Sequence, residues 1–177
     1  MGDDSERGGA DASSGAHRRT LYWASGSPPA WRVLLTLAEK GIPYTSTMLT
    51  FDSGVLRTPP YLSLNPRGLV PVFIDGPVRL YESLAILNYI EFAYPSMPLL
   101  PADAVSRAKA LMRMEEANNL SAAAGEVVYY LRRTPPSDIN EEYLKAKTSA
   151  LHSELALWEM YLVGEVGACV IVVVVAT

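Results

Sequence analysis

The spacing of apolar residues changes character at Pro95-Ser96-Met97-Pro98. Before these prolines, short runs that alternate apolar and polar residues are interleaved with runs in which apolar residues recur every three or four positions. After them the second pattern dominates until a valine-rich run near the end. A period of two is typical of strands, and the longer spacing is typical of helices. The sequence therefore predicts an α/β region followed by an all-helical region.

The first region predicts strands and helices in turn. A short apolar run precedes the first helical stripe, and a second strand candidate is followed by an irregular or briefly helical stretch that ends near Ser63. Asp75-Gly76 lies between two alternating runs, which is a strong signal of a tight hairpin. Ser83 then begins a helix that ends at Pro95. The result is a small mixed sheet packed against helices. The strand candidates are Leu21–Trp23, Tyr44–Leu49, Val70–Ile74 and Val78–Leu80, and the first helical stripe is Trp31, Leu34, Leu35 and Ala38, stopped by Lys40-Gly41.

The second region predicts two long helices. Apolar residues between Leu120 and Leu131 mark one face, and those between Leu151 and Leu162 mark another. Pro135-Pro136 separates the two helices, and Asp138 with Glu141 forms a capping box at the start of the second.

The two ends of the chain have different compositions. Residues 1–20 are rich in Gly, Ser, Ala and Asp without an apolar period, which predicts a disordered tail. This stretch has neither the apolar core of a secretory signal nor the acid-poor composition of an organelle transit peptide. Val170 to Val175 is an unbroken β-branched run, shorter than the ~20 apolar residues of a membrane-spanning helix. It can be a buried strand or an exposed adhesive tail, and we expect no membrane association.

Charge and cysteine content exclude several functions. The net charge of −4 leaves no basic surplus to neutralise phosphates, so we expect no nucleic-acid partner. Cys169 is the single cysteine, which excludes an internal disulfide, a redox pair and a thiolate zinc cluster. His17 and His152 lie far apart in the sequence, so we expect no metal. A reducing compartment, the cytoplasm, fits this composition.

Ser27 stands before Pro28 and Pro29 at the predicted start of the first helix. A serine followed by proline at the first helical position is a favourable N-cap. The positive end of a helix also stabilises an anion by about 0.3–1 kcal/mol, and a thiolate would suit this place. Ser27 is therefore either a helix cap alone or a cap whose outward hydroxyl proton also binds an anion.

Two further junctions have the chemistry of an amino-acid or peptide site. Glu82-Ser83, where Ser83 is the expected N-cap, offers an acceptor for an ammonium group and helix-terminal donors for a carboxylate; capping alone is the alternative. Val70-Pro71 precedes a strand, where proline is tolerated. X–Pro bonds are usually trans, but a cis bond here would turn the Val70 N–H and C=O outward, toward an extended peptide ligand.

Taken together, three segments resemble the cytosolic glutathione S-transferases. Each segment alone is a weak signal, but their order and spacing are specific. The opening strand and Ser-Pro-Pro turn are most similar to the rho class, and the similarity runs from about Leu21 to Gly164. The segments are Leu21-Tyr22-Trp23 through Ser27-Pro28-Pro29-Ala30-Trp31-Arg32-Val33, Asn65-Pro66-Arg67-Gly68-Leu69-Val70-Pro71, and Glu82-Ser83-Leu84-Ala85-Ile86.

The resemblance implies a thioredoxin-like α/β N-terminal domain and an all-α C-terminal domain, assembled as a homodimer. On this basis residues 21–95 form the glutathione-binding domain, 96–102 a linker, and 103–177 an incomplete helical domain with the aberrant apolar tail. Members of the family continue with further helices where this chain has the valine-rich run.

The resemblance also implies a site. Ser27 would be catalytic, donating a hydrogen bond to the sulfur of glutathione; Tyr22 is the rival for this role. Lowering a thiol pKa from about 8.5 by about 2 units, about 2.7 kcal/mol, makes the thiolate predominant at pH 7. Glutathione itself would be bound by Val70 and Pro71 at its cysteinyl backbone, Glu82 and Ser83 at its γ-glutamyl group, and Arg57 at its glycyl carboxylate.

The electrophile would bind in a second, apolar subsite. The candidates are Trp23, Trp31, Met112 and Tyr130, each of which could instead belong to the core. Two positions depart from the family pattern. Ala30 replaces a frequent cysteine, which removes thiol chemistry by that residue, and Leu69 replaces a frequent polar residue, which removes one contact with glutathione.

These observations predict a transferase that conjugates glutathione, as cosubstrate and without a cofactor, to small hydrophobic electrophiles. The alternative is a glutathione-binding or hydrophobic-ligand-binding protein of the same fold without catalysis. The shortened helical domain and Leu69 favour this alternative.

Overall fold

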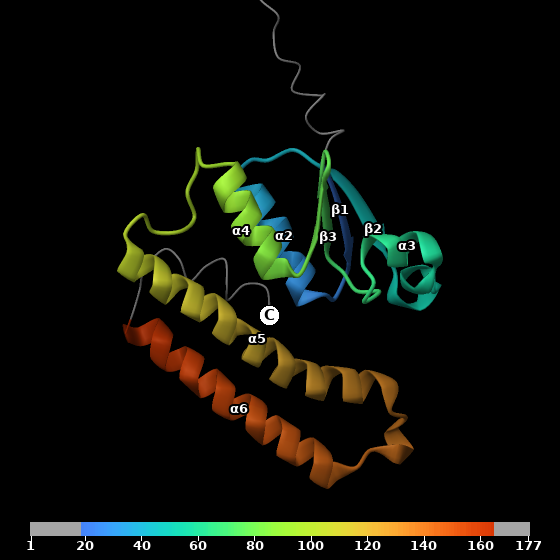
Figure 1. Cartoon of the computed structure of the whole chain (residues 1–177). Coiled ribbons are helices and arrows are strands. Elements are labelled where there is room, and N and C mark those ends of the chain that lie inside the picture. Colours follow the sequence, from blue (N-terminus) through green and yellow to red (C-terminus); the bar gives the residue numbers. More distant parts are fainter. Residues whose placement is uncertain (1–18, 165–177) are drawn as a thin grey trace, which may run out of the picture. The chain divides into compact units, whose positions relative to one another are not determined.

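The computed structural model describes residues 19–164, which form two compact units (Figure 1). Unit 1 ends at Asn88 and unit 2 begins at Tyr89, so the boundary falls inside α4 (Ser83–Ala93). The expected tail at 1–20 lies outside the described residues except for Arg19 and Thr20, which belong to the first strand. The run from Val170 to Val175 also lies outside them.

Unit 1 is built on a four-stranded mixed sheet in the order β2-β1-β3-β4. β1 pairs in parallel with β2 and antiparallel with β3, and β3 pairs antiparallel with β4. Gly76, with a φ of 57°, supplies the turn between β3 and β4, which confirms the predicted hairpin. The strands are β1 (Arg19–Ala24), β2 (Thr45–Leu49), β3 (Val72–Asp75) and β4 (Val78–Tyr81).

Both faces of the sheet are buried. Leu21 and Phe73 are register partners on one face and are fully buried. Residues of the other face, Ala24 and Val72, form a cluster with Tyr61 of α3 (Pro59–Leu64). In Figure 1, α2 (Pro28–Glu39) and α4 are drawn on one side of the sheet and α3 on the other. The coverage is deepest over β1 and β3, whose apolar residues are buried on both faces, whereas β2 at the edge is mostly exposed.

The buried face of α2 differs from the predicted stripe. Ala30, Val33 and Leu37 are the fully buried apolar residues of this helix, whereas Ala38 is exposed. Apolar residues occur on several faces of the helix. Ala30, Val33 and Leu37 form a second stripe at helical spacing, and tertiary packing buries this stripe instead of the predicted one. The end of the helix is as expected, with Lys40 at the C-cap and Gly41 at a φ of 61°.

The stretch between β2 and β3 is helical only in short pieces, as predicted. It contains η1 (Phe51–Ser53), η2 (Val55–Arg57) and α3. Prolines occupy the first positions of α3, where their missing N–H groups have no intrahelical partner to lose.

Unit 2 contains the two predicted long helices, α5 (Ala104–Arg133) and α6 (Glu141–Gly164), with η3 (Pro136–Asp138) between them. Figure 1 shows α5 and α6 as an antiparallel pair, in agreement with their contacts. The predicted capping box is wrong, because Asn140 caps α6: its Oδ1 accepts the Tyr143 N–H at 2.9 Å. Asp138 lies in η3 instead.

The predicted apolar faces of unit 2 are only partly buried. On α5 the buried residues lie between Ala110 and Leu120, whereas Val128 and Leu131, nearer the end of the helix, are exposed. On α6 Trp158 is buried and Leu155 is exposed. Within residues 19–164, no helix combines the length and the apolar character needed to cross a membrane.

Candidate functional site

Three sequence junctions meet at one edge of the sheet in unit 1. Tyr22 of β1 is in register with Val72 of β3, which is in register with Tyr81 of β4. The end of β1, the start of β3 and the end of β4 therefore lie at the same edge. The segments attached there carry Ser27, Val70-Pro71 and Glu82-Ser83, so the topology brings together the residues that the sequence singled out.

Ser27 is the N-cap of α2, as predicted, and is 5% exposed. Its Oγ accepts the Ala30 N–H at 3.4 Å, and its carbonyl oxygen accepts the same N–H at 3.0 Å. Its hydroxyl proton has no acceptor within the described part of the chain. Pro28 and Pro29 follow and have no N–H. The hydroxyl is therefore the available donor at this helix end.

The Val70–Pro71 peptide bond is cis. The residues alone favoured the trans form, and the family resemblance implied the cis form, so the resemblance was the better guide here. Val70 is 9% exposed, and β3 begins directly after Pro71.

The loop before Val70 is held by a buried polar pair that received no role in the sequence analysis. The Leu69 carbonyl oxygen accepts two hydrogen bonds, from Asn65 Nδ2 at 2.8 Å and from the Tyr61 hydroxyl at 2.9 Å. Asn65 Oδ1 also accepts the Arg67 N–H at 3.0 Å. Asn before Pro is a common turn signal, which could have indicated Asn65. No sequence signal identifies the bond from Tyr61.

Glu82 has a φ of 69°, the one positive value at a residue other than glycine among the described residues. This conformation costs about 1–3 kcal/mol and persists where the surroundings require it, often at functional sites. The Glu82 carbonyl oxygen accepts the Ile86 N–H at 3.0 Å, so Glu82 occupies the N-cap position. The prediction that Ser83 is the N-cap is therefore wrong; Ser83 is the first helical residue and is buried.

The Glu82 carboxylate has one ion-pair partner in the described region. Its Oε1 lies 3.5 Å from Nε of Arg67, and both side chains are about two-thirds exposed, at 65% and 67%. An ion pair this exposed contributes little stability. The carboxylate is consequently accessible to a second cation.

Arg57 lies on the same loop system. Its Nη1 donates to the Arg67 carbonyl oxygen at 3.2 Å. A Cβ atom at Gly68 would lie 2.8 Å from that Nη1 and 2.7 Å from the Leu56 carbonyl oxygen, so only glycine fits there. Arg57 thus supports the loop with one nitrogen; whether a carboxylate binds its other nitrogens stays a prediction.

The four candidates for an electrophile subsite lie in different units. Trp23 and Trp31 are half-buried in unit 1, and the Trp23 Nε1 donates to Ser46 Oγ at 2.8 Å. Met112, on α5, is 48% exposed. The Tyr130 hydroxyl accepts the Asn140 N–H at 2.7 Å. Their grouping into one subsite stays a prediction.

The rival residue Tyr22 faces the α3 side of the sheet. Its ring packs edge-on against Tyr61, with ring centroids 6.2 Å apart. Tyr22 is partly buried against the cluster around Ala24 and Val72.

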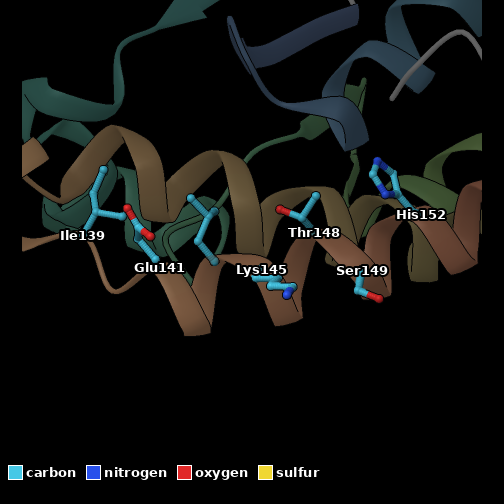
Figure 2. A pocket seen from close by; sticks show the side chains of 7 residues that line it. Ile139, Glu141, Lys145, Thr148, Ser149 and His152 are labelled. Atoms are coloured by element: carbon cyan, nitrogen blue, oxygen red, sulfur yellow. The ribbon is translucent and has the colours of Figure 1, made fainter.

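Two open pockets lie along α5 and α6 in the described part of unit 2. One, of about 510 Å³, is lined by Tyr129, Tyr130 and Tyr143, with Glu126 and Arg133 among its other residues. The other, of about 610 Å³, is shown in Figure 2. Its labelled polar side chains follow one another along one face of α6 and do not converge on a point. These side chains are Glu141, Lys145, Thr148, Ser149 and His152.

No group of three His, Cys, Asp or Glu side chains suited to a metal ion occurs among residues 19–164. The second pocket has one carboxylate, of Glu141, and one imidazole, of His152. At the sheet edge in unit 1, the side chains described above supply the Ser27 hydroxyl, the Glu82 carboxylate and the Arg57 guanidinium.

Comparison with known proteins gives a family match over the same region. The family described as "Glutathione S-transferase, N-terminal domain" matches residues 26–92, a range that begins just before Ser27 and includes Val70-Pro71 and Glu82-Ser83. The match therefore covers all three junctions at the sheet edge.

Relatives extend the similarity into unit 2. The chain is 37% identical over 146 residues to glutathione S-transferase A of Pleuronectes platessa, covering 81% of this chain and 65% of that protein. It is 32% identical over 141 residues to glutathione S-transferase GstB of Escherichia coli (strain K12), covering 78% of this chain and 68% of that protein. The chain spans less than two-thirds of the first of these relatives and 44% of glutathione S-transferase 1 of Dianthus caryophyllus.

Solved structures have the same fold. A glutathione S-transferase from the Antarctic clam Laternula elliptica is 43% identical, with a TM-score of 0.72 over 82% of this chain and 66% of that one. A theta-class enzyme from Xanthomonas axonopodis pv. citri, solved with glutathione bound, is 25% identical, with a TM-score of 0.77 over 86% of this chain and 73% of that one. The expected thioredoxin-like mixed sheet followed by a helical region is confirmed.

Proposed function

The chain belongs to the glutathione S-transferase family, and we propose that it binds glutathione at the sheet edge formed by β1, β3 and β4 and conjugates it to small hydrophobic electrophiles. One observation carries the proposal. The strand register brings Ser27, Val70 and Glu82 to the same edge, within the region that matches the family. Glutathione is the cosubstrate, and the reaction needs no resident cofactor.

Each part of the tripeptide has a complementary group at this edge. The exposed Glu82 carboxylate suits the γ-glutamyl ammonium group, and the start of α4 at Ser83 suits its carboxylate. The main chain of Val70 suits the cysteinyl backbone, as a strand-like partner. Arg57, whose guanidinium already holds the neighbouring loop, suits the glycyl carboxylate.

Ser27 activates the sulfur. Its Oγ accepts the Ala30 N–H, so its own proton is free to be donated to the cysteinyl sulfur. A hydrogen bond to the thiolate, together with the positive end of α2, stabilises the anion over the thiol and lowers the thiol pKa. The proton leaves to solvent. The sulfur lone pair then forms a C–S bond with the electrophile, and the leaving group departs with the electrons of the bond that breaks.

The test is an ultraviolet pH titration of the bound thiol, because the thiolate absorbs where the thiol does not. The full chain with glutathione should titrate well below pH 8.5. Ser27→Ala should return the thiol pKa toward that value, whereas Tyr22→Phe should leave it low. A low thiol pKa that is lost in Tyr22→Phe and kept in Ser27→Ala would assign thiolate stabilisation to Tyr22 instead of Ser27.

A second function is favoured by one position. Leu69, with its side chain 52% exposed, occupies the place beside the site where the family often has a polar residue. A protein that binds glutathione or a hydrophobic ligand without catalysis would fit. Glutathione binding without conjugation of a chlorodinitrobenzene would favour this function.

We extend the proposal to class, assembly and location. The opening strand and Ser-Pro-Pro turn support the rho class. Family membership supports a cytoplasmic location and a homodimer. Light scattering of the full chain would test the homodimer. Trp23, Trp31, Met112 and Tyr130 remain the candidates for the electrophile subsite.

A further inference from the structure

We propose that Asn65 and Tyr61 are positioning residues for glutathione. By donating hydrogen bonds to the Leu69 carbonyl oxygen, they orient the Val70 N–H and strengthen it as a donor to the ligand. The inference rests on the proposed function, because it assigns the Val70 main chain to the cysteinyl backbone of glutathione.

The two donors converge on one oxygen from buried positions. Asn65 Nδ2 lies 2.8 Å and the Tyr61 hydroxyl 2.9 Å from the Leu69 oxygen, and the two residues are 2% and 4% exposed. The loop is also closed by two bonds that Asn65 accepts, from the Gly68 N–H to its carbonyl oxygen at 2.9 Å and from the Arg67 N–H to its Oδ1 at 3.0 Å. The donors to Leu69 therefore do more than close the turn.

The effect reaches the ligand through a single peptide group. The Leu69 C=O and the Val70 N–H belong to the same planar unit, so fixing the oxygen also fixes the direction of the N–H. Two donors use both lone pairs of that oxygen. They also polarise the amide, and such chains strengthen each hydrogen bond by roughly 10–30%.

The Tyr61 hydroxyl keeps its proton over the whole neutral range. Burial, and next the nearby Tyr22 hydroxyl, raise the pKa of Tyr61 to about 12. The donor is consequently present at any pH at which the thiolate of glutathione is useful.

The decisive variant is Tyr61→Phe, which keeps the ring in the cluster and removes one donor. Because Ser27 is untouched, we expect the KM for glutathione to rise about two- to fivefold, with kcat and the bound thiol pKa unchanged. The matched control is Ser63→Ala, also on α3, which removes an exposed bond from Ser63 Oγ to the Pro60 carbonyl and should leave KM unchanged.

A spectroscopic readout separates positioning from general loosening. In the ligand-free chain, the amide nitrogen resonance of Val70 should move upfield in Tyr61→Phe, because it senses hydrogen bonds to the preceding carbonyl. Asn65→Asp, which keeps an acceptor for Arg67 but places a carboxylate against the Leu69 oxygen, should raise KM at least about tenfold. Should Asn65→Asp fail to fold, Tyr61→Phe decides alone.

The outcomes distinguish the two levels of the argument. Wild-type binding of glutathione together with an unchanged KM and an unchanged Val70 resonance in Tyr61→Phe would overturn this inference and leave the proposed function standing. Absence of glutathione binding by the wild-type chain would overturn the proposed function and this inference with it.

Discussion

Unit 1 and unit 2 differ in how far their large apolar side chains are buried. In unit 1 both faces of the sheet are covered, and Leu21, Val33 and Phe73 are fully removed from water. In unit 2 large apolar side chains of α5 and α6 remain exposed, among them Met160 at 60% and Val163 at 84%. Two packed helices share one interface, and this interface cannot bury apolar residues that lie on several faces of each helix.

The unit with the better-buried core also carries the candidate site, whereas the other unit has open surface pockets. The candidate site of unit 1 depends on strand register and on short turns that hydrogen bonds hold in place. The pockets of unit 2 are open, and the polar groups of the one in Figure 2 lie along a helix without converging. Stability and glutathione binding should therefore respond most to changes in unit 1.

The largest expected effect comes from one matched pair of phenylalanines. Phe73→Ala, fully buried in unit 1, should lower the free energy of unfolding by about 3–5 kcal/mol. Phe92→Ala, 71% exposed in unit 2 with the Arg107 guanidinium 5.0 Å from its ring, should cost about 1 kcal/mol or less. Urea denaturation of the full chain measures both. Equal losses would remove the contrast between the units.

The second effect compares two helix N-caps. Ser27→Ala should lower kcat/KM about 100-fold, because a thiol pKa shift of about 2 units is worth about 2.7 kcal/mol. Asp103→Ala removes the cap of α5, where Asp103 Oδ1 accepts the Ser106 N–H at 2.8 Å. This variant should lower the unfolding midpoint but leave the pKa of bound glutathione as in the wild type. Conjugation kinetics and thermal unfolding should be measured on both variants. A large loss of kcat/KM in Asp103→Ala would contradict a purely structural role of this cap.

The third effect has opposite signs for stability and binding. Glu82→Gly removes a side chain from a residue at a φ of 69° and should raise the free energy of unfolding by about 1 kcal/mol. It should weaken glutathione binding, because the carboxylate for the ammonium group is lost. Glu82→Gln is the control: it keeps the positive φ, so binding should fall without a gain in stability. A Glu82→Gly variant that binds as well as the wild type would exclude a role for this carboxylate.

The smallest effect is a pH dependence in unit 2. Hydrogen bonds from the Ser106 N–H, and smaller ones nearby, lower the pKa of Asp103 in the folded chain. A carboxyl group with a lowered folded pKa stabilises the fold above its unfolded pKa, about 3.9, and this contribution disappears as the pH falls through the folded pKa. Asp103→Asn keeps a capping oxygen but cannot titrate. The difference between its unfolding midpoints at pH 7 and pH 3 should be smaller than in the wild type; an unchanged difference would contradict the assignment.

Local signals predicted much of the fold correctly. The Ser27 cap, the Gly76 turn and the break at Pro135-Pro136 each depend on residues adjacent in sequence. Errors arose where two local solutions compete. α2 has apolar residues on adjoining faces, and Asn140 competes with Asp138 for the cap of α6. Tertiary packing decides such cases, and a single sequence does not contain it.

The site was predictable only in part for the same reason. Ser27, Val70 and Glu82 come from motifs, but their proximity follows from the pairing of three strands. The bond from Tyr61 to the Leu69 oxygen joins residues eight positions apart, through a loop whose path no periodicity describes. The cis bond at Val70–Pro71 was implied by family resemblance alone, since the free energies of the two isomers differ by only about 0.5–1 kcal/mol.

The turn at Gly76 lies at the end of the hairpin away from Val72 and Tyr81, the register pair next to the site. A tag or a fluorescent probe inserted into this turn would thus be separated from the candidate site by the length of β3 and β4, two paired strands of four residues each. A reporter could therefore be installed at this turn while the proposed glutathione end of the sheet stays as it is.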